Sequence, residues 1–153
     1  MMTSLELIPV LHNVMSAQRV LEAAKLVYGL GFKSFVVSKA LGAAAQSGVP
    51  EAQKLAIRLK RNIFFLVDID DVIEVFNPDR VLTVTPAKYG GEPLSKVVND
   101  LSGKVVVVFG GLEPGLSMRE IEKGMHVFPD KVVDDIGSIG LLAITLYMLK
   151  ELT

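Results

Sequence analysis

Short apolar runs alternate with amphipathic segments along the whole chain. Runs of strand length occur at residues 5–11, 32–37, 63–67, 80–85 and 104–109, with a smaller one at residues 126–128. They are continuous rather than alternating, which is typical of strands that are buried on both faces. The pattern therefore predicts an α/β fold with a mostly parallel sheet that is covered by helices on both faces.

Helical segments are expected between these strands, at residues 16–30, 40–45, 51–60, 70–76, 93–101, 117–123 and 134–152. Ser16 is a candidate N-cap of the first helix, and Ser117 with Glu120 three residues later matches a capping box. Strand and helix alternate without an internal repeat, a linker or a low-complexity tract. Residues 1–153 are therefore expected to form a single domain.

Composition limits the classes of function. Half of the residues are hydrophobic and 22% are charged, which favours a folded domain with a sizeable core. The net charge is −1, so any contact with nucleic acid needs a local basic patch. The absence of cysteine excludes disulfides, thiol catalysis and cysteine metal sites, and it fits a cytoplasmic protein. The most apolar region, residues 136–149, is too short to span a bilayer, so no membrane contact is expected.

A glycine-rich turn at residues 110–115, Gly-Gly-Leu-Glu-Pro-Gly, follows a run of four valines and a phenylalanine. Its spacing approaches that of a phosphate-binding P-loop, but Leu116 occupies the position of the essential lysine and Glu113 adds a repelling charge. The turn is therefore poorly suited to a polyphosphate, and taken alone its glycines are equally well explained by a tight backbone turn. Ligands of parallel sheets bind beyond the carboxyl ends of the strands, where this turn and the loops at residues 85–91 and 129–140 are expected.

Other kinds of catalytic site have weaker support. His12 and His126 are the only histidines and lack the spacing of a zinc site. A Ser–His–Asp triad can be assembled on paper, but the sequence has no G-x-S-x-G elbow. The acidic residues between positions 68 and 74 could bind magnesium, although an N-cap with acids at the start of a helix explains them more simply. A restriction-type or RecB-type nuclease would need an E-x-K or Q-x-K pattern, which does not occur, so no metal site is predicted.

Lys54, Arg58 and Arg61 recur at helical spacing and form the one basic stripe of the sequence. Such a stripe suits the phosphate backbone of RNA, although a solvated helix face explains it as well. These three residues are the candidate RNA-binding residues.

Three longer segments carry a family resemblance. The first runs from Val10 to Lys25 and on to Gly31 and Phe32, the second is residues 108–117, and the third combines residues 127–130 with 136–147. Together they resemble the motifs of the SPOUT (SpoU/TrmD) superfamily of RNA methyltransferases, in a SpoU-like form. The first motif is divergent, because its two functional positions, aligned on Asn13, fall on Arg19 and Lys25.

The resemblance implies a C-terminal trefoil knot, an S-adenosylmethionine site and a homodimer. Arg19 and Lys25 are the implied catalytic residues, and a lysine needs a lowered pKa to act as a base. S-adenosylmethionine carries no phosphate, so it suits a glycine turn that lacks a lysine. The implied cofactor-binding residues lie in the three loops at the strand ends: Thr85, Pro86, Gly110, Gly111, Gly115, Leu116, Phe128, Pro129, Ile136, Ser138 and Gly140.

Three hypotheses about function follow. The first is a cytoplasmic, S-adenosylmethionine-dependent methyltransferase of SPOUT type that acts on tRNA or rRNA. The second is a protein of the same fold that binds cofactor or RNA without catalysis, which the altered first motif favours. The third is a metal-dependent nuclease that uses the acidic residues between positions 68 and 74. Methyl transfer to an RNA pool separates the first two, and magnesium-dependent cleavage would support the third.

Overall fold

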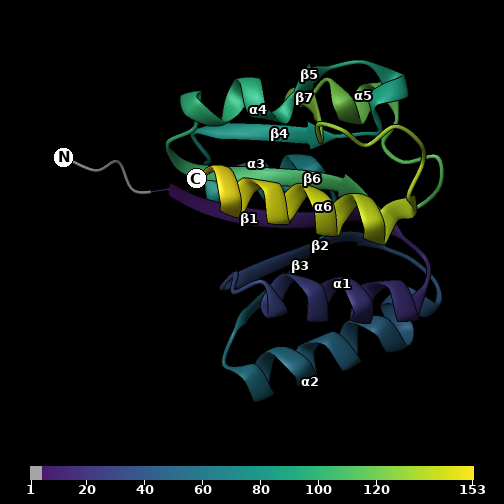
Figure 1. Cartoon of the computed structure of the whole chain (residues 1–153). Helices are drawn as coiled ribbons and strands as arrows, with labels where there is room; N and C mark the ends of the chain where they lie inside the picture. The colour runs from purple at the N-terminus through teal and green to yellow at the C-terminus, as the bar shows by residue number, and fades with distance from the viewer. Residues whose placement is uncertain (1–4) are drawn as a thin grey trace.

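The computed structural model describes residues 5–153, which build a parallel sheet with helices on both faces (Figure 1). The sheet has seven strands in the order β3-β2-β1-β6-β4-β7-β5. The strands are β1 (Leu5–Val14), β2 (Ser34–Ala40), β3 (Asn62–Leu66), β4 (Arg80–Val84), β5 (Glu92–Pro93), β6 (Gly103–Gly110) and β7 (Met125–Phe128). All of the described strand pairs are parallel, which confirms the predicted sheet.

The helices are α1 (Ala17–Gly29), α2 (Val49–Leu59), α3 (Ile69–Phe76), α4 (Leu94–Val97), α5 (Met118–Ile121) and α6 (Gly137–Leu152). Helices α1 to α5 lie in connections between strands, and α6 follows the last strand. The side chain of Ser16 accepts a hydrogen bond from the Arg19 N–H, and Ser117 with Glu120 forms the predicted capping box. Helix α6 lies across β1 and β6 in Figure 1, while α2 packs beside α1 and against β3.

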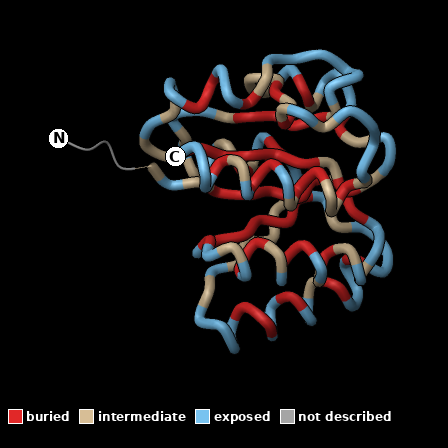
Figure 2. Tube along the Cα trace, in the orientation of Figure 1, coloured by how far each residue is buried: buried red, intermediate tan, exposed pale blue. Residues whose placement is uncertain are grey.

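The central strands are buried on both faces, as the continuous apolar runs predict. In β6, the side chains of Val105, Val107 and Phe109 join a core that contains residues of α1 and α6. The alternate residues Val106 and Val108 join a second core, which is closed by α3 and α5. Figure 2 shows this burial along the middle of the sheet. Two separate cores hold the carboxyl ends of the strands in fixed positions.

Four predicted helices differ from the structure. Residues 40–45 and 51–60 were expected as two helices, but a π-helix at Ala44–Gly48 runs directly into α2. The missing side chain of Gly48 allows this, because a Cβ there would lie 3.0 Å from the Cα of Ala17. The helix expected at residues 93–101 is split into α4 and a short 3-10 turn, and α6 begins three residues later than expected.

The predicted α/β architecture is confirmed. The trefoil knot stays a prediction, because strand order and pairing do not establish chain threading. Within residues 5–153, no helix combines the length and the apolar character that crossing a membrane requires.

Candidate functional site

The glycine turn after β6 is held against the end of β1 by close backbone contacts. The N–H of Gly111 donates to the carbonyl oxygen of His12 at 2.7 Å. A Cβ at Gly111 would lie 2.7 Å from the Cβ of Val14, and a Cβ at Gly110 would lie 2.8 Å from the backbone of Gly115. Packing therefore requires a glycine at both positions, at Gly110 within the turn and at Gly111 against the end of β1.

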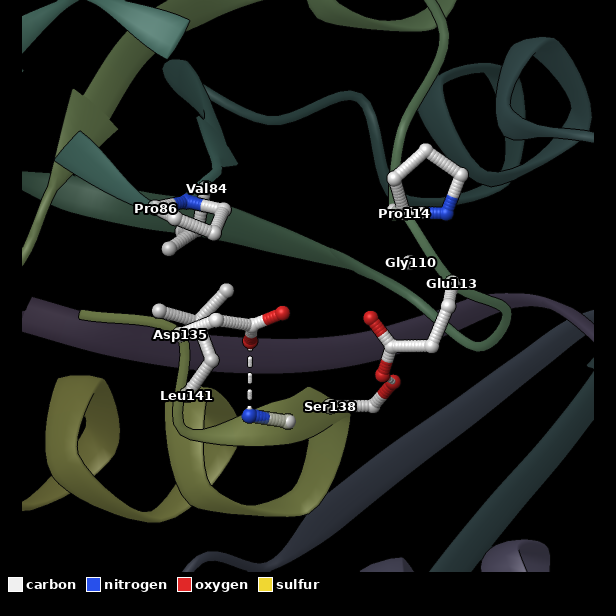
Figure 3. A pocket seen from close by; sticks show the side chains of 10 residues that line it. Val84, Pro86, Gly110, Glu113, Pro114, Asp135, Ser138 and Leu141 are labelled. Atoms are coloured by element: carbon white, nitrogen blue, oxygen red, sulfur yellow. Dashed lines mark hydrogen bonds between the residues drawn. The ribbon is translucent and has the colours of Figure 1, made fainter. Parts of the chain in front are cut away.

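A small pocket lies between this turn and the start of α6 (Figure 3), and we call it the glycine-turn pocket. Its lining residues are Val84, Pro86, Gly110, Glu113, Pro114, Gly115, Asp135, Gly137, Ser138 and Leu141. The Ser138 hydroxyl donates to Glu113 Oε1 at 3.2 Å, and the Gly137 N–H donates to Asp135 Oδ1 at 2.8 Å. The free volume is about 20 Å³, which is room for a single water molecule, so a larger ligand requires the loops to move apart.

The structure brings four of the predicted cofactor-binding residues to this pocket: Pro86, Gly110, Gly115 and Ser138. The other seven predicted residues are not part of its lining: Thr85, Gly111, Leu116, Phe128, Pro129, Ile136 and Gly140. Leu116 packs into the core on the α3 and α5 face, and Thr85 Oγ1 is paired with His126 Nε2 at 2.6 Å. Sequence reasoning missed Asp135 and treated Glu113 only as a repelling charge. The roles of all these residues in cofactor binding stay predictions.

A second, larger depression of about 630 Å³ lies beyond the carboxyl ends of β1, β2 and β3, and we call it the histidine pocket. Its lining residues are His12, Lys39, Leu41, Val67, Asp68, Asp70, Ser117, Arg119, Glu120 and Lys123. They come from two strands, the start of α3 and the region of α5. The pocket therefore depends on the strand order, which places segments far apart in the sequence side by side.

His12 contacts one side chain that lines this pocket, Glu120, and one that is buried behind it, Ser38. Its Nδ1 lies 2.8 Å from Ser38 Oγ, and its Nε2 lies 2.9 Å from Glu120 Oε2. An ionised carboxylate only accepts, so Nε2 carries the proton and Nδ1 accepts from the Ser38 hydroxyl. Burial lowers the pKa of His12, although the nearby Glu120 carboxylate opposes this shift. His12 is therefore neutral at neutral pH.

The three residues have the connectivity of a Ser–His–Glu triad, but Ser38 is 0% exposed and His12 is 1% exposed. Ser38 cannot reach a substrate as a nucleophile. Glu120 is the member that faces the pocket, with its side chain 17% exposed. Burial raises the pKa of Glu120, but hydrogen bonds from Ser117 and the proximity of His12 outweigh burial and lower it. The carboxylate is therefore ionised at neutral pH.

Charged side chains surround Glu120. Lys39, Arg119 and Lys123 supply positive charge to the pocket, and Lys123 Nζ is paired with Asp70 Oδ1 at 2.6 Å. Asp68 Oδ1 lies 4.0 Å from His12 Nε2 and also caps α3, where it accepts from the Ile69 N–H at 2.7 Å. The simpler explanation of the acidic run, as an N-cap with acids at a helix start, is confirmed.

The residues predicted as catalytic lie apart. Arg19 Nη1 donates to the carbonyl oxygen of Gly111 at 2.7 Å, on the glycine turn. Lys25 instead borders a groove of about 250 Å³ between α1 and α2, together with Lys54 and Arg58. Arg61 is outside this groove and donates to the carbonyl oxygen of Phe32. Two of the three predicted RNA-binding residues thus share a surface with Lys25.

Sequence comparison finds relatives of one family. A model of the family described as "RecB-family nuclease (DUF2122)" matches residues 42–148. The chain is 42% identical over 144 residues to "Putative type II restriction enzyme ApeKORF2002P" of Aeropyrum pernix, covering 94% of this chain and 92% of that protein. It is 36% identical over 141 residues to "Putative type II restriction enzyme MjaORF1200P" of Methanocaldococcus jannaschii, covering 92% of this chain and 94% of that protein.

Structure comparison finds a different set of proteins at low identity. A "putative methylase family protein" from Neisseria gonorrhoeae has a TM-score of 0.74 at 13% identity, covering 97% of this chain and 83% of that one. The SpoU methyltransferase AviRb from Streptomyces viridochromogenes, in complex with AdoMet, has a TM-score of 0.70 at 11% identity, covering 95% and 57%. A protein described by "2-OH methylation of C/U34 on tRNA" has a TM-score of 0.70 at 16% identity, covering 96% and 95%. These likenesses show a shared fold.

The comparisons correct the family and the function inferred from sequence motifs. The assignment to the SPOUT methyltransferases is wrong, because the family model and both sequence relatives are described as nucleases or restriction enzymes. The first functional hypothesis, an RNA methyltransferase, is overturned by the same findings. The motifs correctly indicated the fold because they encode strand ends and turns, which unrelated activities can share.

Proposed function

Because this chain belongs to the family described as RecB-family nuclease (DUF2122), we propose that it cleaves phosphodiester bonds of nucleic acid in the histidine pocket. One observation carries the proposal. Lys39, Arg119 and Lys123 border the same depression as the Glu120 carboxylate. The cations are suited to bind a phosphate group, and a carboxylate beside a bound phosphate is suited to remove a proton from an attacking hydroxyl.

The donor set does not match the metal centre that a RecB-type nuclease implies. Among residues 5–153, no three His, Cys, Asp or Glu side chains gather around a point where they could hold a metal ion. Asp70 is bound by Lys123, and Asp68 is engaged at the helix start. The proposed cleavage therefore relies on the side chains of the pocket.

Cleavage is tested with end-labelled DNA and RNA oligonucleotides, single- and double-stranded, in Mg²⁺ and in EDTA. We expect shorter fragments with the wild-type protein and a loss of at least about tenfold in rate for the double variant K39A/R119A. Lys33→Ala is the matched control, because Lys33 lies outside the histidine pocket, just before β2. If no substrate is cleaved under any of these conditions, the proposal is wrong.

A second proposal is that the glycine-turn pocket binds S-adenosylmethionine. It is supported by the convergence of the glycine turn and the α6 start around one cavity, and by the AdoMet complex of a protein with this fold. Glu113 and Asp135 place negative charge at the cavity, which suits a sulfonium cation. The loops must part, because the free volume holds a single water.

Titration calorimetry with S-adenosylmethionine, with ATP as the control ligand, tests this second proposal. We expect micromolar binding of S-adenosylmethionine alone, and its loss in Ser138→Leu, whose side chain would fill the cavity. Ser102→Leu, at an exposed position outside the pocket, is the control for a similar change. Absence of heat in a folded, ligand-free wild-type protein would remove the proposal without affecting the cleavage assay.

We also propose RNA as the nucleic acid, with the groove formed by Lys25, Lys54 and Arg58 as an additional contact to its backbone. The charge-reversal variant K54E/R58E should weaken RNA binding and reduce its dependence on salt. Arg61→Glu is a comparison rather than a neutral control, because Arg61 contacts the Phe32 carbonyl. Equal affinity and equal salt dependence in the wild type and K54E/R58E would contradict this contact.

We also propose a homodimer that uses the exposed part of α6. The apolar residues Val27 and Tyr28 of α1 and Leu146 and Leu149 of α6 lie in the core and are not available for an interface. Tyr147 of α6 remains exposed and is the candidate contact. Light scattering should give twice the monomer mass, and Tyr147→Glu should give the monomer. A monomeric wild-type protein at high concentration would contradict the proposal.

A further inference from the structure

We propose that the histidine pocket cleaves RNA through the ribose 2′-hydroxyl, with Glu120 as the general base and His12 and Ser38 as positioning residues. This inference rests on the proposed cleavage function and deepens it, because it specifies ribose-containing substrates. It requires no protein-bound metal ion.

The source of the nucleophile follows from the donor set. A metal ion held by protein side chains alone needs several ligands, and the described residues provide no group of three. A hydroxyl that is already attached to the substrate needs no such site, because its proximity replaces a bimolecular encounter. In RNA, the 2′-oxygen lies close to the phosphorus that is bonded to the 3′-oxygen of the same ribose. DNA lacks this hydroxyl and therefore has no internal nucleophile, so the pocket would cleave RNA and leave DNA intact.

The base follows from exposure and hydrogen bonding. Glu120 Oε2 accepts from His12 Nε2 at 2.9 Å, and Oε1 accepts from the Ser117 N–H at 2.8 Å. Each carboxylate oxygen has a further lone pair, so Glu120 can accept a hydrogen bond from a hydroxyl group bound in the pocket. His12 is buried and both its ring nitrogens are occupied, which leaves it no free atom for a substrate. Its contribution is to fix the direction of the Glu120 carboxylate.

The surrounding cations complete the site. Lys39 follows the buried part of β2, while Arg119 and Lys123 flank Glu120 in the sequence. A phosphate between them would gain negative charge as the 2′-oxygen attacks, and nearby cations stabilise that charge more in the transition state than in the ground state. The pocket thus holds a base and charge stabilisation within one depression of about 630 Å³.

The reaction is a single displacement at phosphorus. Glu120 takes the proton of the 2′-hydroxyl, the bond between the 2′-oxygen and phosphorus forms, and the bond between phosphorus and the 5′-oxygen breaks. The leaving 5′-oxygen takes a proton from solvent water, and Glu120 returns its proton to solvent. The products are a 2′,3′-cyclic phosphate and a 5′-hydroxyl. No oxidation or reduction takes place.

The test compares a single-stranded RNA, its DNA analogue and an RNA with one 2′-deoxy residue at the observed cleavage position, all in EDTA. We expect cleavage of the RNA alone, a cyclic phosphate by mass spectrometry and a block at the 2′-deoxy residue. This substrate comparison uses wild-type protein, so its result does not depend on the folding of a variant.

Two variants test the roles of the residues. Glu120→Gln should slow RNA cleavage by about 10²-fold or more, while Glu122→Gln, an exposed neighbour outside the pocket, should retain the wild-type rate. His12→Asn should move the acidic limb of the pH–rate profile, which a purely structural role would not do. Cleavage of DNA and RNA alike with a requirement for Mg²⁺ would overturn the inference and leave the proposed nuclease function intact. No cleavage of any substrate would overturn both.

Discussion

Arg19 of α1 donates a hydrogen bond from Nη1 to the main-chain oxygen of Gly111, at 2.7 Å, and thereby ties the first helix to the glycine turn. The bond is partly buried and crosses 92 positions of sequence. A guanidinium that is engaged in this way fixes a turn in place. Arg19 therefore has a structural role in holding the glycine turn, which is separate from the catalytic role predicted for it from sequence.

The first prediction concerns this bond. Arg19→Ala should lower the free energy of unfolding by about 1 to 3 kcal/mol, because it removes a charged donor from a partly buried carbonyl. Chemical denaturation measures the change. Lys25→Ala on the same helix should change stability by less than about 0.5 kcal/mol, since Lys25 is exposed. Equal effects of the two substitutions would show that the Arg19 bond does not stabilise the fold.

The second prediction concerns an unpaired hydroxyl in α6. Thr145 is 0% exposed, and its Oγ1 has no hydrogen-bond partner. Thr145→Val should therefore raise the free energy of unfolding by about 1 kcal/mol, because valine has nearly the same shape and no buried polar atom. Thr83→Val is the matched opposite case: Thr83 Oγ1 donates to the Ile121 carbonyl at 2.9 Å, so its loss should destabilise. A destabilised Thr145→Val would indicate a partner for that hydroxyl.

The third prediction concerns the backbone of the glycine turn. Gly110→Ala should destabilise by about 1 to 3 kcal/mol, because the added Cβ would meet the backbone of Gly115 at 2.8 Å. Gly29→Ala, where a Cβ has open space at the end of α1, should stabilise by about 0.5 kcal/mol. Thermal melts of both variants decide the matter. An unchanged melting temperature for Gly110→Ala would mean that the turn relaxes without cost.

The fourth prediction concerns pH. The pKa of His12 in the folded protein is lowered from 6.5, so below about pH 6.5 the unfolded chain takes up a proton that the folded protein does not. The free energy of unfolding should therefore be largest above that pH and should fall as the pH decreases toward the pKa of His12 in the folded protein. His126, whose pKa burial also lowers, contributes in the same direction. Denaturation at several pH values from 8 to 5 should show a weaker decline for His12→Asn than for the wild type, and parallel declines would exclude His12 as a source.

The fold could be predicted from the sequence in most of its elements, because burial on both faces leaves continuous apolar runs. The run at residues 104–109 corresponds to β6, and the serine at position 117 does cap α5. The two-residue strand β5 left no such signal. The insertion of β6 between β1 and β4 also left none, because strand order depends on packing between distant segments.

The site was harder to predict than the fold. The glycine turn is contiguous, so its position beyond a buried strand could be recognised. The histidine pocket brings together His12, Asp68 and Glu120, with Ser38 buried behind His12, and no motif spacing connects these residues. Asp68 and Glu120 also take part in the capping boxes of α3 and α5. Helix capping alone therefore accounts for both residues in the sequence, and nothing there indicates that they share a pocket. Only the three-dimensional arrangement reveals their shared location.

The position of β6 beside β1 also determines when the sheet can be completed during synthesis. Leu5 pairs with Gly103 and His12 pairs with Gly110, so one edge of β1 has no partner until nearly three-quarters of the chain has left the ribosome. At about 5 to 20 residues per second, this edge stays open for roughly 5 to 20 s. An open edge of a buried apolar strand is a template for pairing with other chains. We therefore expect nascent chains that stall before residue 103 to be prone to pairing with other chains.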